Sequence, residues 1–186
     1  MPIKRLPLDG LGPEEVEAAI AELPIERLYL FDPDRRQIAI FEGEADWVQY
    51  QLNDNERRRV RDGFLVHNHP PHAEFAVDDP RYDQSSYSSL DWHAVVDLNV
   101  RSMVLVSTRW RCELGRPRAG LLAVHNPAWH LLEMLNSMYE HFRQADEEML
   151  GTPPSGLAEQ LRATLSHRVN EVFASEIGAT YRREER

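Results

Sequence analysis

The chain has almost no capacity for covalent or thiolate cross-linking. Cys112 is the single cysteine among 186 residues, so an internal disulfide is excluded. A metal site built from several thiolates is excluded for the same reason. Any metal ion bound by this chain would therefore need imidazole and carboxylate ligands.

Long apolar runs are missing as well. No stretch of the sequence approaches the ~18 uninterrupted apolar residues of a membrane-spanning helix. Residues 1–10 also lack the apolar core of a signal peptide. We therefore expect a soluble, cytoplasmic protein that has no membrane partner.

Basic residues are outnumbered by acidic ones. The chain has 21 Lys and Arg against 31 Asp and Glu, which gives a formal net charge of −10. A protein with this charge has no strong positive field to attract phosphates, which argues against a dedicated nucleic-acid binder. The one basic run, at 56–61, is predicted to be a solvated face.

The remaining composition is that of an ordinary globular protein. Hydrophobic residues make up 42% and charged residues 28%, and 186 residues suit about one domain. Short apolar runs bounded by turn residues predict strands at 27–31, 37–41, 63–67, 102–108 and 120–124. Apolar residues at helical spacing predict helices at about 13–23 and 88–99. This alternation predicts an α/β fold, a mixed sheet flanked by helices.

The C-terminal region differs in character from the rest. Two amphipathic patterns, at about 129–142 and 157–173, are separated by the GTPPS segment at 151–155. They predict a helical hairpin that closes the chain. We divide the chain into 1–126, which holds the candidate site residues, and a C-terminal helical extension over 127–186. The apolar stripes of the hairpin most simply pack on the sheet, and an oligomer interface or a partner groove is the alternative.

Two histidines stand at the end of a predicted strand. His67 and His69 are separated by one residue, so both side chains project from the same side of the pleat. Pro70 ends the strand directly after them. A lone His-x-His pair is usually structural, but two convergent imidazoles also make half of a metal site. A catalytic zinc site has three protein ligands and a water.

A capped helix supplies the candidate third ligand. Ser88 with Asp91 three residues later is a helix-start signature, and the first helical turn can aim the Asp91 carboxylate at the strand end. By itself, this pattern is an ordinary capping box. Asp83 is a rival ligand at shorter range, but it has no helix start of its own. His72 is more simply an exposed loop residue.

Taken in this order, the motifs resemble a known family. His67-Asn68-His69-Pro70, then Ser88-x-x-Asp91, then the apolar strand at 102–108, are similar to the JAB/MPN domain metalloproteases, also called JAMM enzymes. The likeness is greatest to the prokaryotic JAB and RadC-like branches, and it covers about 24–107.

The resemblance implies a JAB/MPN-like metal-binding domain over 1–126, with a sheet and helices arranged as in cytidine deaminases. It implies that His67, His69 and Asp91 hold Zn²⁺, and that Ser88 supports the oxyanion.

The same resemblance implies a glutamate that handles the catalytic water. In the family this residue lies where the chain leaves the first helix and enters the first strand, and Glu26 has that position here. Glu42 and Glu44, on either side of Gly43, are the competitors. The ordinary alternative for each of the three is a solvated surface acid.

The implied activity is hydrolysis of a peptide or isopeptide bond in a protein or peptide, such as the tail of a ubiquitin-like protein. Two alternatives stay open: a RadC-like or phage-associated accessory protein, and a non-catalytic MPN scaffold. The 21 residues between His69 and Asp91 exceed the family's spacing. The additional length falls in the loop 71–87, where it can form a flap while its ends stay in place.

Overall fold

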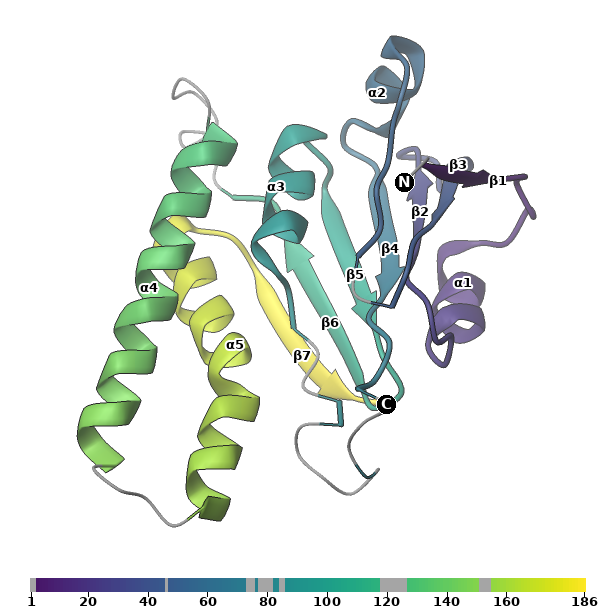
Figure 1. Ribbon diagram of the computed structural model, residues 1–186. Helices are drawn as coiled ribbons and strands as arrows, with labels where there is room; N and C mark the ends of the chain where they lie inside the picture. Colours follow the sequence, from purple (N-terminus) through teal and green to yellow (C-terminus); the bar gives the residue numbers. More distant parts are fainter. Residues whose placement is uncertain are drawn as a thin grey trace.

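The protein is a mixed sheet flanked by helices. The computed structural model describes residues 3–45, 47–72, 76, 82–83, 86–117, 127–150 and 155–186. Within these residues, seven strands form one sheet and five helices pack around it (Figure 1). The predicted α/β class with a mixed sheet is confirmed. The strand predicted at 120–124 lies outside the described residues.

The sheet has the strand order β1-β3-β2-β4-β5-β6-β7. Its strands are β1 (Lys4–Leu6), β2 (Arg27–Phe31), β3 (Gln37–Glu42), β4 (Phe64–Asn68), β5 (Ser102–Val106), β6 (Trp110–Gly115) and β7 (Tyr181–Glu185). β4 and β5 pair in parallel, and the other neighbouring strands pair antiparallel. The predicted strands near 27–31, 37–41, 63–67 and 102–108 therefore correspond to β2, β3, β4 and β5.

The helices lie on both faces of this sheet. They are α1 (Pro13–Ile20), α2 (Asp54–Val60), α3 (Ser89–Asp97), α4 (Pro127–Leu150) and α5 (Ser155–Ile177). α4 contacts both α3 and α5 (Figure 1). The predicted C-terminal helical extension also contains β7, which pairs with β6 and so adds a strand to the sheet. Among the described residues, no helix combines the length and apolar character needed to cross a membrane.

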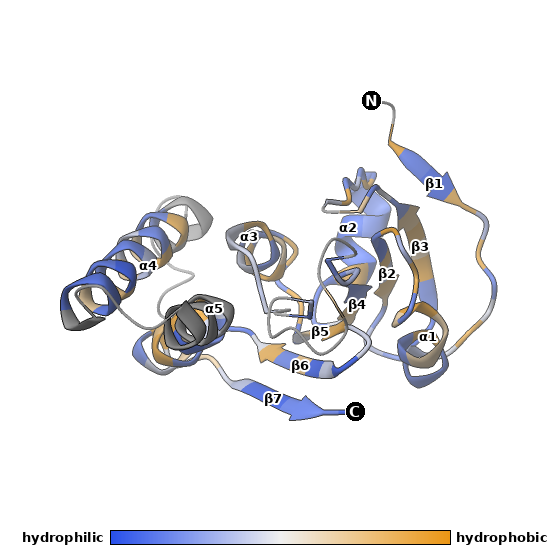
Figure 2. Ribbon diagram, turned by 60° about the horizontal axis from the view of Figure 1, so that its bottom comes forward, coloured by the Kyte–Doolittle hydropathy of each residue, from blue (hydrophilic) through white to orange (hydrophobic). Residues whose placement is uncertain are grey.

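Alternation along the strands divides the core into two layers. On one face, Val16 and Ile20 of α1 pack with Val66 of β4 and neighbouring strand residues. On the other face, α3 and α5 cover a second cluster that includes Leu65, the residue next to Val66. Figure 2 shows that β2 and β3 carry hydrophobic residues, whereas α2 and β7 are mostly hydrophilic.

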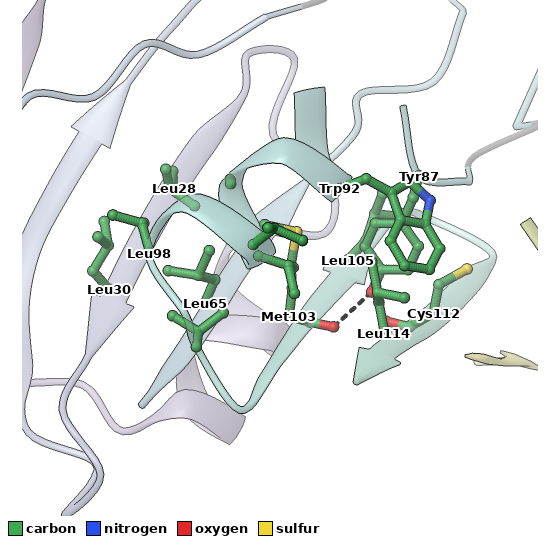
Figure 3. Packing of buried hydrophobic residues seen from close by; sticks show 14 of the residues in the cluster. Leu28, Leu30, Leu65, Tyr87, Trp92, Leu98, Met103, Leu105, Cys112 and Leu114 are labelled. Atoms are coloured by element: carbon green, nitrogen blue, oxygen red, sulfur yellow. Dashed lines mark hydrogen bonds between the residues drawn. The ribbon is translucent and has the colours of Figure 1, made fainter. Parts of the chain in front are cut away.

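The second cluster also forms the base of the candidate site. Figure 3 shows Trp92 of α3 and Tyr87 beside residues of β5 and β6. The Tyr87 hydroxyl lies 2.7 Å from the Met103 carbonyl oxygen and 2.8 Å from that of Cys112. These contacts join the start of α3 to the middle of the sheet.

Candidate metal centre

The two histidines lie at the carboxyl end of β4, on the face covered by α3. Their rings are 4.8 Å apart and nearly perpendicular, at 83°. The backbone N–H of His69 donates to the Val106 carbonyl at 3.1 Å, which continues the ladder with β5 past the end of the strand. The side chain of His67 is 2% exposed and that of His69 is 20% exposed. The first imidazole is therefore enclosed, whereas the second reaches the surface.

Antiparallel pairing brings Glu26 to the same point. Leu28 of β2 is in register with His67 of β4. Because the strands are antiparallel, Glu26, two residues before Leu28, lies opposite His69, two residues after His67. Glu26 Oε1 lies 3.7 Å from His69 Nε2. One ligand atom from each of Glu26, His67 and His69 lies within 4.8 Å of the other two, a group that could hold a metal ion.

The start of α3 supplies a second carboxylate. Asp91 Oδ1 lies 3.5 Å from His67 Nε2, and Asp91 Oδ2 lies 3.7 Å from His69 Nε2. Ser88 is the N-cap of α3. Its backbone N–H and its hydroxyl both donate to Asp91 Oδ2 at 2.7 Å, and its oxygen accepts the Asp91 N–H at 3.3 Å. The capping box therefore holds one carboxylate oxygen and leaves Oδ1 facing the enclosed imidazole.

Burial favours the neutral form of both imidazoles. The pKa of His67 is lowered to about 4, mainly by loss of solvent; the Asp91 carboxylate opposes this shift and nearby His69 adds to it. Burial also lowers the pKa of His69, again opposed by Asp91. A neutral imidazole nitrogen has the free electron pair that metal binding requires. The pair is thus ready to bind a cation near neutral pH.

Ligand bonds of about 2.0–2.2 Å place neighbouring ligand atoms of a tetrahedral ion about 3.3–3.6 Å apart. His67 Nε2 lies 3.5 Å from Asp91 Oδ1, and His69 Nε2 lies 3.7 Å from the other oxygen, Oδ2. The three ligand atoms that all lie within 4.8 Å of one another belong to Glu26, His67 and His69. Within the described part of the chain, His67 Nε2 is buried without a hydrogen-bond partner. A buried nitrogen of this kind is rare and calls for an explanation. A cation between the imidazoles and Asp91 would satisfy it.

The rival carboxylates have other contacts. Glu42 pairs with Lys4 and also accepts from Arg27 at 2.6 Å, which lowers its pKa. Glu44 is exposed. Asp83 is buried, and its Oδ2 accepts from the Thr108 hydroxyl and the Arg109 N–H at 2.9 and 2.8 Å. The charge of Asp83 still acts on His69, where it opposes the lowering of the pKa by burial. Glu26 and Asp91 have carboxylate oxygens 3.5–3.7 Å from the imidazole nitrogens.

Asn68, between the two histidines, has a structural role that the sequence did not reveal. It points to the opposite face of β4 and is 0% exposed. Its side-chain oxygen accepts the Arg27 N–H at 2.8 Å, and its amide donates to the Ile25 carbonyl at 3.0 Å. Asn68 therefore forms hydrogen bonds with the backbone on both sides of Glu26. The sequence held one indication of this role, which is the position of Asn68 on a buried strand, where a polar side chain needs hydrogen-bond partners.

The loop after β3 holds the Glu26 backbone from the other side. Glu26 N–H donates to the Glu44 carbonyl at 2.6 Å, and the Gly43 N–H donates to the Glu26 carbonyl at 2.9 Å. The loop can fold this tightly only because residue 43 is glycine. A Cβ there would lie 2.1 Å from the Trp47 carbonyl oxygen. The segment with the two rival glutamates thus positions Glu26 through its backbone.

A cleft with a volume of about 1170 Å³ opens in front of the cluster. Apolar side chains line it on both sides, including Trp47 and Tyr50 after β3, Leu90 of α3 and Tyr139 of α4. Among the described lining residues there is no lysine or arginine. The cleft therefore suits an uncharged segment better than a ligand that presents a carboxylate. Most of the loop 71–87, with its predicted flap, lies outside the described residues.

Comparison of the chain with known protein families, with curated proteins and with solved structures found no match.

Proposed function

We propose that the protein is a zinc-dependent metallohydrolase of the JAB/MPN type that cleaves a peptide or isopeptide bond. One observation carries the proposal: His67 Nε2 is buried with no hydrogen-bond partner among the described residues, and it faces Asp91 Oδ1 at 3.5 Å with His69 beside it. Two imidazoles and a carboxylate are a common catalytic zinc ligand set. The match of this set to the JAMM motif order supports the same reading.

His67, His69 and Asp91 would hold the ion. When bound, zinc supplies Lewis acidity, which lowers the pKa of a coordinated water and polarises an amide carbonyl. Ser88 keeps one oxygen of Asp91 in place through its two 2.7 Å hydrogen bonds. Its hydroxyl also lines the cleft, from which it can turn to donate to the oxyanion that forms during attack.

Glu26 is the proposed general base. It accepts a proton from the attacking water as the water oxygen bonds to the amide carbon. The same proton passes to the nitrogen as the C–N bond breaks, and the amine leaves. Glu26 is buried next to His69, and four hydrogen bonds hold the backbone of residues 25–27. Both features support this role.

The cleft supports a polypeptide substrate. Its exposed apolar side chains, including Leu90 at 69% and Tyr139 at 38%, suit an uncharged, extended chain segment. The tail of a ubiquitin-like protein is proposed as one substrate on the ground of the motif resemblance alone.

Metal analysis of three variants tests the proposal. His69→Ala is expected to lose stoichiometric zinc, because it removes one ligand. Glu26→Gln is expected to keep zinc and to lose hydrolysis of peptide and isopeptide substrates. His130→Ala, at an exposed histidine of α4, is the matched control and should keep both.

Retention of one zinc per chain by His69→Ala would refute the metal site. Retained activity in Glu26→Gln, with loss in Glu42→Gln or Glu44→Gln, would reassign the base.

A further inference from the structure

A buried asparagine of the C-terminal helix contacts the segment that carries Ser88 and Asp91. Asn170 of α5 is 1% exposed. Its side-chain oxygen accepts the indole N–H of Trp92 at 2.5 Å. Its amide nitrogen lies 2.8 Å from the Tyr87 carbonyl and 3.1 Å from the Ser86 hydroxyl. The asparagine therefore holds the chain directly before Ser88 and directly after Asp91.

His69 and Asp91 are separated by 21 residues, so local chain geometry does not fix the start of α3 relative to β4. The Tyr87 hydroxyl makes one tertiary link, to the carbonyl oxygens of Met103 and Cys112. The capping box between Ser88 and Asp91 is internal to α3, so it orients the carboxylate within the helix. It does not orient the helix relative to β4. Contacts from outside α3 must do that.

Asn170 is suited to this task because its contacts are directional. Trp92 also packs edge-on against Phe173 of α5, with ring centroids 5.0 Å apart, but apolar packing by itself tolerates small rotations of a helix. A hydrogen bond to the indole nitrogen restricts the rotation of α3 about its axis. The hydrogen bond to the Tyr87 carbonyl restricts how far the first turn of α3 can shift along the helix axis.

We propose that Asn170 is a positioning residue for the metal centre, and that α5 thereby sets the placement of Asp91 opposite the histidine pair. This inference rests on the proposed function, because it concerns the same metal ligands. It predicts that a residue without any contact to the ion controls its affinity. Loss of a partner that orients a ligand typically weakens metal binding 10- to 100-fold.

The test is a Co²⁺ titration of the metal-free protein, read by visible absorption and by the dissociation constant. Asn170→Ala is expected to weaken Co²⁺ binding about tenfold or more and to change the absorption bands that report coordination geometry. Ile177→Ala is the matched control. It removes a buried side chain of the same helix and is expected to lower stability while leaving affinity and spectrum unchanged.

A second variant keeps the proposal falsifiable if Asn170→Ala fails to fold. Trp92→Phe keeps the aromatic ring and removes only the indole N–H, so we expect it to weaken Co²⁺ binding about threefold. When both variants fold, their effects on affinity should be less than additive, because they break the same contact. Wild-type affinity and spectrum in folded Asn170→Ala, or wild-type affinity in Trp92→Phe, would overturn the proposal. Failure of the proposed metal site gives a different result, because His69→Ala would then still bind one metal ion per chain.

Discussion

Truncation of Asn68 tests how much its hydrogen bonds to the backbone on either side of Glu26 stabilise the protein. Asn68→Ala removes the acceptor of the Arg27 N–H and the donor to the Ile25 carbonyl. A buried polar group without a partner costs ~1–3 kcal/mol. Ile25 is only half-buried, so water can partly replace its lost donor. We therefore expect the free energy of unfolding to fall by about 2 to 4 kcal/mol.

Val66→Ala is the matched control for this truncation. Val66 lies on the same strand and the same face as Asn68 and is 1% exposed. Its truncation removes apolar contact and leaves a cavity, at a cost of about 2 to 3 kcal/mol. It leaves every hydrogen bond of Asn68 in place. The two variants should therefore lose similar stability for different physical reasons.

Urea unfolding measures the stability loss, and native-state hydrogen exchange of the Arg27 amide separates the two causes. In Asn68→Ala this amide should exchange faster than the loss of global stability explains, because its acceptor is gone. In Val66→Ala it should follow global stability. A loss below about 1 kcal/mol in Asn68→Ala, against ~1–3 kcal/mol for each unpaired group, would refute the reasoning. So would equal amide exchange in the two variants.

Three further predictions concern a glycine, an ion pair and the metal. Gly43→Ala should destabilise the protein by about 1 to 3 kcal/mol, because the new Cβ meets backbone. Gly115→Ala should cost less, because the close atom is the rotatable Thr180 hydroxyl at 2.2 Å. Thermal unfolding of the two variants compares these losses of stability. Glu56 has a lowered pKa through its hydrogen bond to Arg5, so it contributes stability above its unfolded pKa of about 4.5 that is lost as pH falls through the lower folded value. Unfolding of Glu56→Gln and wild type should thus differ at pH 7 and converge at acid pH, and a constant difference contradicts this. Zinc at a hundred times its dissociation constant should stabilise the wild type by about 3 kcal/mol, reversibly on chelation. No such gain is expected in His69→Ala, and an equal gain there would argue against the site.

Local pattern predicted β2, β3, β4 and β5 because their apolar runs are bounded by turn residues. β2 is predicted with its observed limits at both ends. β1, β6 and β7 were missed. The sequences of the outer strands β1 and β7, KRL and YRREE, carry mostly charged side chains, and only two residues of β6 are buried. Contacts with neighbouring strands stabilise them instead, such as Arg183 of β7 over the ring of Trp110 at 3.8 Å.

The contrast between local pattern and long-range contacts applies to the site as well. The His67-x-His69 spacing on a strand and the Ser88 cap indicated metal-binding chemistry, because both depend on neighbours in the chain. The role of Asn68 could not be predicted, since its partners near Glu26 lie more than 40 residues away. The role of Asn170 was hidden for the same reason, with a partner 78 residues away.

The sequence by itself determined which side chains have the chemistry to bind a metal and which local elements carry them. Strand alternation and helix capping act over a few residues, so they can be read directly from the order of the chain. Only the tertiary structure decided that the carboxylates of Glu26 and Asp91 lie within 4 Å of the imidazole nitrogens. That choice depends on strand register and on hydrogen bonds between distant segments, which become defined only when the sheet and α5 pack together.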